Sequence, residues 1–244
     1  MQITPPFLPA VFETRYKRFF ADLKDTDGKT LTVHCPNTGS MKNCLVPGSD
    51  CWYSVSDNPK RKLPGTLELV TTSRGQLAGV NTSRANHLVR EAIESGLIES
   101  LQGYKQMRSE VAYGLEKSRI DLLLEDPQRG QCYIEVKNVT LEGVDGKVMF
   151  PDAVTSRGAK HLRELMTMLE QGHRAVLFFC VQIADAKSME IATEIDPTYS
   201  QTLSRALGLG LEVMAWRAKL SPEEITLDSA IPFIQVRQAP ELSN

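Results

Sequence analysis

The chain has 244 residues, of which 41% are hydrophobic and 24% are charged, and its formal net charge is −2. This length suits one large domain or two modest domains with an ample core, and the composition is typical of a soluble globular protein. The sequence holds no uninterrupted apolar run of about 18 residues, so a membrane span is not expected. The small net charge also excludes binding of nucleic acid through a general basic excess.

The N-terminus and the cysteines bear on the compartment. Residues 1–6 lack the basic-then-apolar layout of a signal peptide. The five cysteines include no C-x-x-C pair, so they are expected to be reduced thiols. Both features favour a cytoplasmic protein. The sequence does not indicate its oligomeric state.

Residues 1–80 consist of short strand-like segments and turns, and we place a domain boundary at residue 80. Alternating apolar residues predict strands over 10–23, 30–34, 51–55 and 66–71. Four or five short strands in a segment of this size predict a small barrel or sandwich, and an OB-like barrel is one such fold.

Basic and aromatic residues alternate in the first of these strands. Arg15, Lys17 and Arg18 are interleaved with Tyr16, Phe19 and Phe20. Cations would neutralise phosphates and aromatic rings would stack on bases, so the pattern suits a DNA-binding surface. An alternative fits at least as well, in which Phe19 and Phe20 belong to the core and the cations are only solvated. Residues 1–80 carry ten basic against seven acidic side chains, which supports the first interpretation weakly.

The segment 35–41 reads as a loop. The amides and hydroxyls of Asn37, Thr38 and Ser40 could hold a phosphate oxygen there, although an ordinary turn would have the same composition.

Residues 81–244 show mixed helical and strand periodicity. Helices are predicted over 85–95, 159–169 and 199–208, and strands over 175–182, 211–216, 225–228 and 233–237. Together with a central hairpin, this order predicts a mixed α/β sheet with helices on its faces.

The central hairpin carries the most informative residues. Asp121 begins one apolar run, Glu135 and Lys137 flank Val136 in a second, and a turn at 125–130 separates the two. Residues i and i+2 of a strand share a face, so Glu135 and Lys137 should point the same way, and pairing of the runs would bring Asp121 to that face.

Two carboxylates beside a lysine suit the hydrolysis of phosphate esters. Mg²⁺, or Mn²⁺ in its place, takes oxygen ligands, so Asp121 and Glu135 are the expected metal ligands, with Lys137 holding a water. A surface hairpin with a solvated Glu–Lys pair is the alternative. The acids stand at the inner ends of apolar strands, however, where an unpaired charge costs free energy.

A further polar cluster lies around the start of the helix predicted at 159–169. Thr155, Arg157 and His161 lie where backbone amides favour an anion. The planar guanidinium of Arg157 matches phosphate geometry and could clamp DNA. His161 is more often a surface or capping residue at such a place.

These motifs carry a family resemblance. The pattern Glu110, Asp121, Glu135 and Lys137 resembles the PD-(D/E)xK nuclease core, in which a helical acid, a strand Asp and a strand E-x-K build the metal site. Glu110 stands at the position of the helical acid, although Val111–Gly114 after it is strand-like. More closely, the chain is similar along nearly its whole length to the bacterial sugar fermentation stimulation protein A family. The segments that match are 37–41, 80–82, 85–86, 118–121, 135–140, 150–153, 155–158 and 161–162.

The resemblance implies an OB-like domain over 1–80 and a PD-(D/E)xK-like domain over 81–244, with DNA binding and a link to maltose and other sugar use. We therefore expect a DNA-binding protein with an Mg-dependent nuclease site and no strong sequence preference, acting on double- or single-stranded DNA. Two alternatives stay open. The protein could be a catalytically inactive DNA-binding regulator, or a metal-dependent hydrolase of a phosphoester other than DNA.

Overall fold

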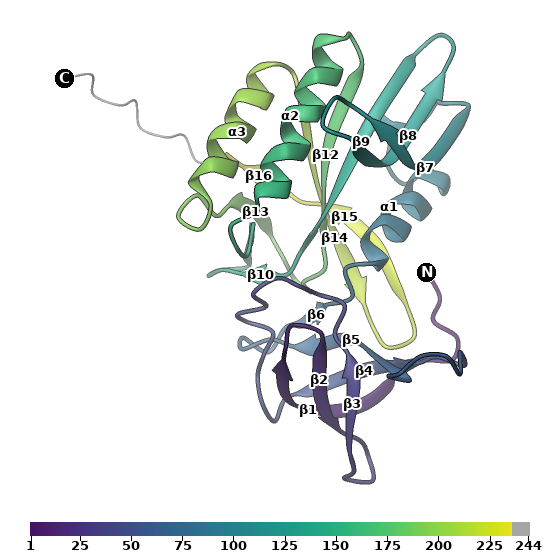
Figure 1. The fold of residues 1–244 in the computed structure, drawn as a ribbon, viewed down its shortest axis with the longest axis vertical. Coiled ribbons are helices and arrows are strands. Elements are labelled where there is room, and N and C mark those ends of the chain that lie inside the picture. Colours follow the sequence, from purple (N-terminus) through teal and green to yellow (C-terminus); the bar gives the residue numbers. More distant parts are fainter. Residues whose placement is uncertain (236–244) are drawn as a thin grey trace, which may run out of the picture.

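The computed structural model describes residues 1–235 and consists of an N-terminal barrel below a larger α/β domain (Figure 1). The N-terminal strands pair in the order β3-β2-β1-β4-β5-β6, and an additional pairing of β3 with β5 closes the barrel. This confirms the predicted barrel. Its strands are β1 (Leu8–Tyr16), β2 (Phe20–Lys24), β3 (Thr30–His34), β4 (Asp50–Val55), β5 (Gly65–Thr71) and β6 (Leu77–Gly79).

One strand prediction in the barrel is wrong. Residues 10–23 form two strands, β1 and β2, joined by a tight turn at 17–19. Lys17 and Arg18 adopt positive φ angles of 48° and 63°, although neither is a glycine or asparagine. A side chain that precedes the turn stabilises it, because the guanidinium of Arg15 donates two hydrogen bonds to the carbonyl of Arg18. The rings of Tyr16 and Phe20 also stack across the turn, at a centroid distance of 5.5 Å.

The second domain is built on a six-stranded mixed sheet in the order β15-β14-β12-β9-β8-β7. β12 runs parallel to β9 and β14, and the outer pairs are antiparallel. The predicted central hairpin is β8–β9. The elements are β7 (Gln106–Tyr113), β8 (Ser118–Asp126), β9 (Gly130–Val139), β12 (Arg174–Val181), β14 (Glu212–Leu220) and β15 (Ile225–Ala230).

Helices cover both faces of this sheet, because alternate residues of its strands are apolar on opposite sides. Leu122 and Ile134 share a core with helix α1, whereas Leu123 and Tyr133 share a core with α2 and α3. The mixed α/β fold class is as predicted. The helices are α1 (Arg84–Glu94), α2 (Ser156–Glu170) and α3 (Pro197–Gly208), with a short 3₁₀ turn, η1 (Glu99–Leu101).

A small third sheet, in the order β10-β11-β13-β16, lies near the barrel end of this domain (Figure 1). Its strands are β10 (Leu141–Glu142), β11 (Lys147–Phe150), β13 (Ser188–Ile191) and β16 (Phe233–Ile234). The strand predicted over 233–237 is thus seen in its first part, and residues 236–237 lie outside the described residues.

The two domains share packing and hydrogen bonds. β6 ends at Gly79 and α1 begins at Arg84, on either side of residue 80. Residues before β1 contact the second domain, since the amide of Ile3 donates to the carbonyl of Glu223 and Phe7 belongs to the core around α1. One apolar cluster also runs from barrel residues such as Met41 into the sheet and α2.

A buried ion pair joins the barrel to α1. Glu68 on β5 is only 2% exposed, and the guanidinium of Arg84 binds both of its carboxylate oxygens at 2.6 and 2.8 Å. Ser54 and Asn81 donate to the same carboxylate at 2.7 and 2.9 Å. A buried carboxylate with this many donors is stable only while its cation is present.

Two further features concern the helices and the cysteines. No helix within residues 1–235 is both long and apolar enough to cross a membrane. All five cysteines are buried free thiols.

We predict that Arg84→Met destabilises the protein by about 3–5 kcal/mol, because it leaves the Glu68 charge buried without its partner. Urea denaturation measures the free energy of unfolding. The matched control is Arg90→Met, which removes an exposed i,i+4 pair with Glu94 and should cost at most about 0.5 kcal/mol. Equal losses in the two variants would contradict this account of the interface.

Candidate functional site

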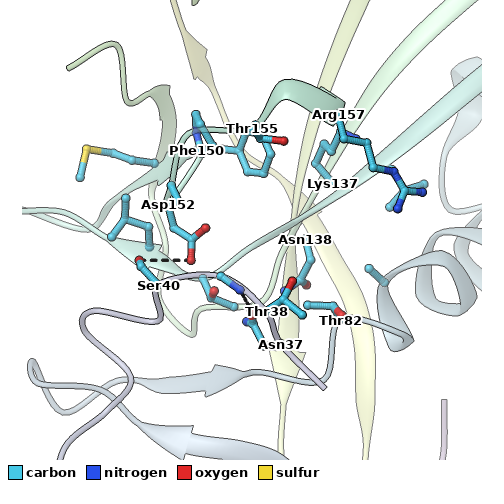
Figure 2. Close-up of a pocket in the computed structure, with 18 of the residues that line it drawn as sticks. Asn37, Thr38, Ser40, Thr82, Lys137, Asn138, Phe150, Asp152, Thr155 and Arg157 are labelled. Carbon is cyan, nitrogen blue, oxygen red and sulfur yellow. Dashed lines mark hydrogen bonds between the residues drawn. The ribbon is translucent and has the colours of Figure 1, made fainter. Parts of the chain in front are cut away.

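A cleft of about 850 Å³ lies between the barrel and the second domain. Figure 2 shows residues of both domains facing it, with Asn37, Thr38 and Ser40 from the barrel opposite Lys137 and Arg157. Thr82 and Asn86, near the start of α1, complete one side. The cationic lining residues are Arg15, Arg18, Lys137 and Arg157, and the acidic ones are Asp121 and Asp152.

Asp121 lies where the pairing of β8 with β9 stops. The last paired residues there are Leu122 and Ile134. Beyond them the carboxylate of Asp121, in place of a backbone carbonyl, accepts the hydrogen bond from β9. One carboxylate oxygen accepts the amide of Val136 at 2.7 Å, and the other accepts the side-chain amide of Asn86 at 2.8 Å. The side chain thus holds the two strands together at a gap in the ladder, and it lines the cleft.

Glu135 and Lys137 lie on one face of β9, as predicted, with Val136 in the opposite core. The ammonium of Lys137 donates to a carboxylate oxygen of Glu135 at 2.6 Å. The Lys137 side chain is 14% exposed and reaches the cleft, whereas that of Glu135 is 2% exposed and lies beneath it. The second oxygen of Glu135 is buried and has no hydrogen-bond partner.

The pKa values of the two carboxyl groups are shifted in opposite directions. Burial, together with the nearby charge of Glu135, raises the pKa of Asp121 to about 6. Burial also acts to raise the pKa of Glu135, but the charge of Lys137 and the hydrogen bonds from His161 and Lys137 outweigh it and hold that pKa below its usual value. Glu135 is therefore the ionised partner at neutral pH, and Asp121 is the carboxyl whose protonation is closest to changing.

His161 is buried rather than exposed, in contrast to the expectation for a residue on the first turns of a helix. Its Nδ1 contacts the oxygen of Glu135 that binds Lys137. Its Nε2 accepts a hydrogen bond from the guanidinium of Arg157 at 3.3 Å. α2 begins at Ser156, earlier than predicted, with Thr155 as its N-cap. A continuous polar chain therefore links Arg157 at the cleft to Glu135 below it.

The loop over 37–41 already holds an anion from the second domain. The hydroxyl of Ser40 and the amide of Met41 donate to Asp152 at 3.3 and 3.2 Å (Figure 2 shows the Ser40 contact). A Cβ at Gly39 would overlap the same carboxylate, so a glycine is needed for this approach. The amide of Gly39 is taken by Asn37. Two loop donors are therefore occupied by a carboxylate, and Thr38 remains as a hydroxyl facing the cleft.

The three predicted DNA-binding cations, one at the end of β1 and two on the turn that follows it, have different surroundings. Arg15 lines the cleft, but its guanidinium holds the carbonyls of Asn37, Gly39 and Arg18. Arg18 is exposed and lines the cleft, and Lys17 is exposed beside it on the turn without lining the cleft. Phe19 is 47% exposed, so it does not belong to the core.

Glu110 is apart from the other acids. It lies on strand β7, not on a helix, with an exposed side chain and a φ angle of 55°. Its carbonyl accepts a hydrogen bond from Arg119, and its side chain does not line the cleft. The helix that does reach Asp121 is α1, and the residue that it contributes is Asn86 rather than an acid.

The donor set fits a cation of the Mg²⁺ type. Asp121 lines the cleft and Glu135 lies beneath it, and the buried oxygen of Glu135 that has no hydrogen-bond partner could accept a cation. Within residues 1–235 no group of three or more His, Cys, Asp or Glu side chains could hold a metal. Mg²⁺ is usually bound by one or two carboxylates, with water and substrate phosphate supplying the remaining oxygens, whereas a closed protein cage needs more ligands.

Three residues of the site were missed from the sequence. Asn86 had a signal, because it belongs to the segment 85–86 that carries the family resemblance. His161 was considered but expected at the surface. Asp152 belongs to the matching segment 150–153, but nothing in the sequence indicated its contact with the loop over 37–41, because Ser40 lies 112 residues earlier in the chain.

The closed barrel followed by the mixed sheet and its cleft define a class of two-domain protein, with an OB domain before an RE domain. Residues 14–80 match the family described as SfsA N-terminal OB domain, and residues 83–224 match the Sugar fermentation stimulation protein RE domain. The chain belongs to the sugar fermentation stimulation protein family.

Curated relatives and a solved structure agree with this assignment. Sugar fermentation stimulation protein homologs from Shewanella pealeana and Teredinibacter turnerae are 53% and 55% identical to the chain. The matches cover 95% and 96% of the chain and 99% and 100% of the relatives. The fold is similar to that of SfsA from Pyrococcus furiosus, solved in complex with Ca²⁺, with a TM-score of 0.85 at 24% identity over 96% of this chain and 98% of that one. The expected family and the OB-like barrel are thereby confirmed.

We predict that Asp121 titrates near pH 6 in the metal-free protein. Because the folded state then binds this proton more tightly than the unfolded chain, the contribution of Asp121 to stability falls as the pH rises from 3.8 to about 6. Carboxyl ¹³C shifts measure the pKa, and Glu135→Gln should lower it because a like charge is removed. Asp228, whose pKa is lowered by the hydrogen bond from Arg217, is an internal control. An Asp121 pKa at or below 3.8 would contradict the described environment.

Proposed function

We propose that the protein binds DNA in the cleft between its domains and cleaves phosphodiesters there with Mg²⁺ or Mn²⁺. One observation carries the proposal. Asp121, Glu135 and Lys137 converge at the floor of a cleft whose lining has four cationic side chains against two carboxylates. An electropositive cleft attracts a polyanion, and the two acids beside a lysine are the groups that phosphoryl transfer needs.

The exposed cations would hold the DNA backbone. Arg18 from the barrel and Arg157 from the start of α2 both line the cleft, and Lys17 adds a charge beside it. Arg15 contributes charge, but its hydrogen-bonding groups are committed to the loop. Phosphate contacts of this kind give affinity without reading base sequence, which agrees with the expectation of no strong sequence preference. Asn37, Thr38 and Ser40 would lie along the same strand, and the exposed Thr38 has a hydroxyl that could donate to it.

Asp121 and Glu135 would hold the metal, which when bound polarises the phosphate and makes a water more acidic. The P. furiosus relative was solved with Ca²⁺, another cation that takes oxygen ligands, and this supports a divalent-cation site in the family. Lys137 would hold and orient the attacking water, since its ammonium reaches the cleft while Glu135 fixes its position. His161 steadies Glu135 from the side of the protein core. Glu110 has no role in this proposal because it lies outside the cleft.

A DNA-binding regulator without turnover is a second candidate, and the hydrogen bonds of the acids favour it. Both oxygens of Asp121 and one oxygen of Glu135 already have partners in the protein. A metal would have to share these oxygens. Hydrolysis of a small phosphoester is a third candidate, because about 850 Å³ is also the size of a small-molecule pocket. The part in maltose use that the resemblance implies stays a prediction, as does the cytoplasmic location, with which the five reduced thiols agree.

We predict that Lys137→Met abolishes Mg²⁺-dependent cleavage of DNA while DNA affinity changes by less than about threefold, since one recessed phosphate contact among several is lost. Gel assays with supercoiled and single-stranded substrates measure cleavage, and fluorescence anisotropy measures affinity. Lys105→Met, at an exposed lysine outside the cleft, is the matched control and should cleave like wild type.

Three outcomes have distinct meanings. Cleavage retained by Lys137→Met would refute the role of this lysine. DNA binding without cleavage by the wild type, in either metal, would favour the regulator. Absence of DNA binding, with hydrolysis of a small phosphoester, would favour the third candidate.

A further inference from the structure

We propose that the cleft accepts a single DNA strand and excludes an intact duplex, an inference that rests on the proposed function and specifies its substrate. The first reason is depth. The Lys137 side chain is only 14% exposed and that of Glu135 only 2%, so a phosphate can reach them only by entering between the two domains. The backbone of a duplex would have to carry the paired strand in with it.

The walls of the cleft are held in place, so it cannot simply widen. On the barrel side, Asp152 holds the loop through Ser40 and Met41. Nearby, the side chain of Asn43 donates to the carbonyl of Thr140 at 3.2 Å and accepts the amide of Glu142 at 3.0 Å. The Glu68–Arg84 pair and the apolar cluster shared by the domains add to this attachment. Domains joined in this way are not expected to separate freely.

The volume of the cleft agrees with a single strand. About 850 Å³ lies within the range of small-ligand pockets, which is room for a few nucleotides. The major groove alone of a B-form duplex is about 12 Å wide. The volume of even a short stretch of whole duplex therefore exceeds the volume of the cleft. A strand with its partner removed can bend into the cleft and present one phosphate to its floor.

Exposed apolar side chains in the cleft lining and beside it provide surfaces for unpaired bases. Phe19 is 47% exposed and follows the cleft-lining Arg18 in the turn between β1 and β2, and it takes no part in the stack of Tyr16 on Phe20. Val154 lines the cleft from the second domain and is 77% exposed. Aromatic rings stack on bases whose faces are free, whereas in a duplex neighbouring base pairs already cover those faces. Phe19 beside a cation is therefore a stacking platform suited to a single strand.

The test is fluorescence anisotropy of the full chain in EDTA at one fixed salt concentration. The probes are a labelled single strand, the blunt duplex of the same sequence, and that duplex with a single-stranded tail. We expect the single strand and the tailed duplex to bind about tenfold or more tightly than the blunt duplex, because only they offer stacking. Phe19→Ala should weaken single-strand binding by roughly tenfold and blunt-duplex binding by less than about twofold. Val55→Ala, which shortens another exposed apolar residue of the barrel outside the cleft, is the matched control and should bind like wild type.

The possible results separate this inference from the proposed function. Equal or tighter binding of the blunt duplex would overturn the single-strand inference. Metal-dependent cleavage of that duplex in the gel assay would leave the nuclease proposal standing. Single-strand binding unchanged in Phe19→Ala would overturn the stacking platform. Failure to bind any of the three probes would overturn both proposals.

Discussion

The site depends on the place where β8 and β9 stop pairing. Hydrogen bonding between the strands ends at Leu122 and Ile134, and the carboxylate of Asp121 then accepts the amide of Val136 in place of a backbone carbonyl. A buried amide must find an acceptor, so the acid satisfies the backbone while it occupies the floor of the cleft. From that point β9 carries Glu135 and Lys137 on the same face. A strand pair that continued its ladder would leave no opening for a substrate.

The second condition is that neither domain contains the whole cleft. The α/β domain supplies the acids, the lysine and Arg157, while the barrel supplies the opposite wall. Asp152 inserts a carboxylate into the barrel loop, and Glu68 receives Arg84 from α1 in the reverse direction. In the first contact a carboxylate of the α/β domain accepts hydrogen bonds from the barrel loop. In the second, a guanidinium of the α/β domain donates to a carboxylate of the barrel. The barrel therefore completes the site and also fixes its width.

The sequence was most informative where a local rule applies, and least informative where contacts join distant residues. The β8–β9 hairpin followed from two apolar runs around a turn, and the shared direction of Glu135 and Lys137 followed from strand periodicity. The turn at Lys17 and Arg18 was missed because Arg15 and a ring stack hold it, without glycine or proline. Asp152 and His161 acquired their roles from residues 112 and 26 positions earlier in the chain. Their partners become visible only when the domains are assembled.

The central claim is that Asp121 and Glu135 form one divalent-cation site, and calorimetric titration with Mn²⁺ and Mg²⁺ tests it most directly. The wild type should bind the metal, and affinity should fall as the pH drops below about 6, where Asp121 takes up a proton. Binding should be lost in Asp121→Ala and in Glu135→Ala, while Glu110→Ala, outside the cleft, should bind like wild type. Absence of metal binding by the wild type, or its persistence in both cleft variants, would contradict the account.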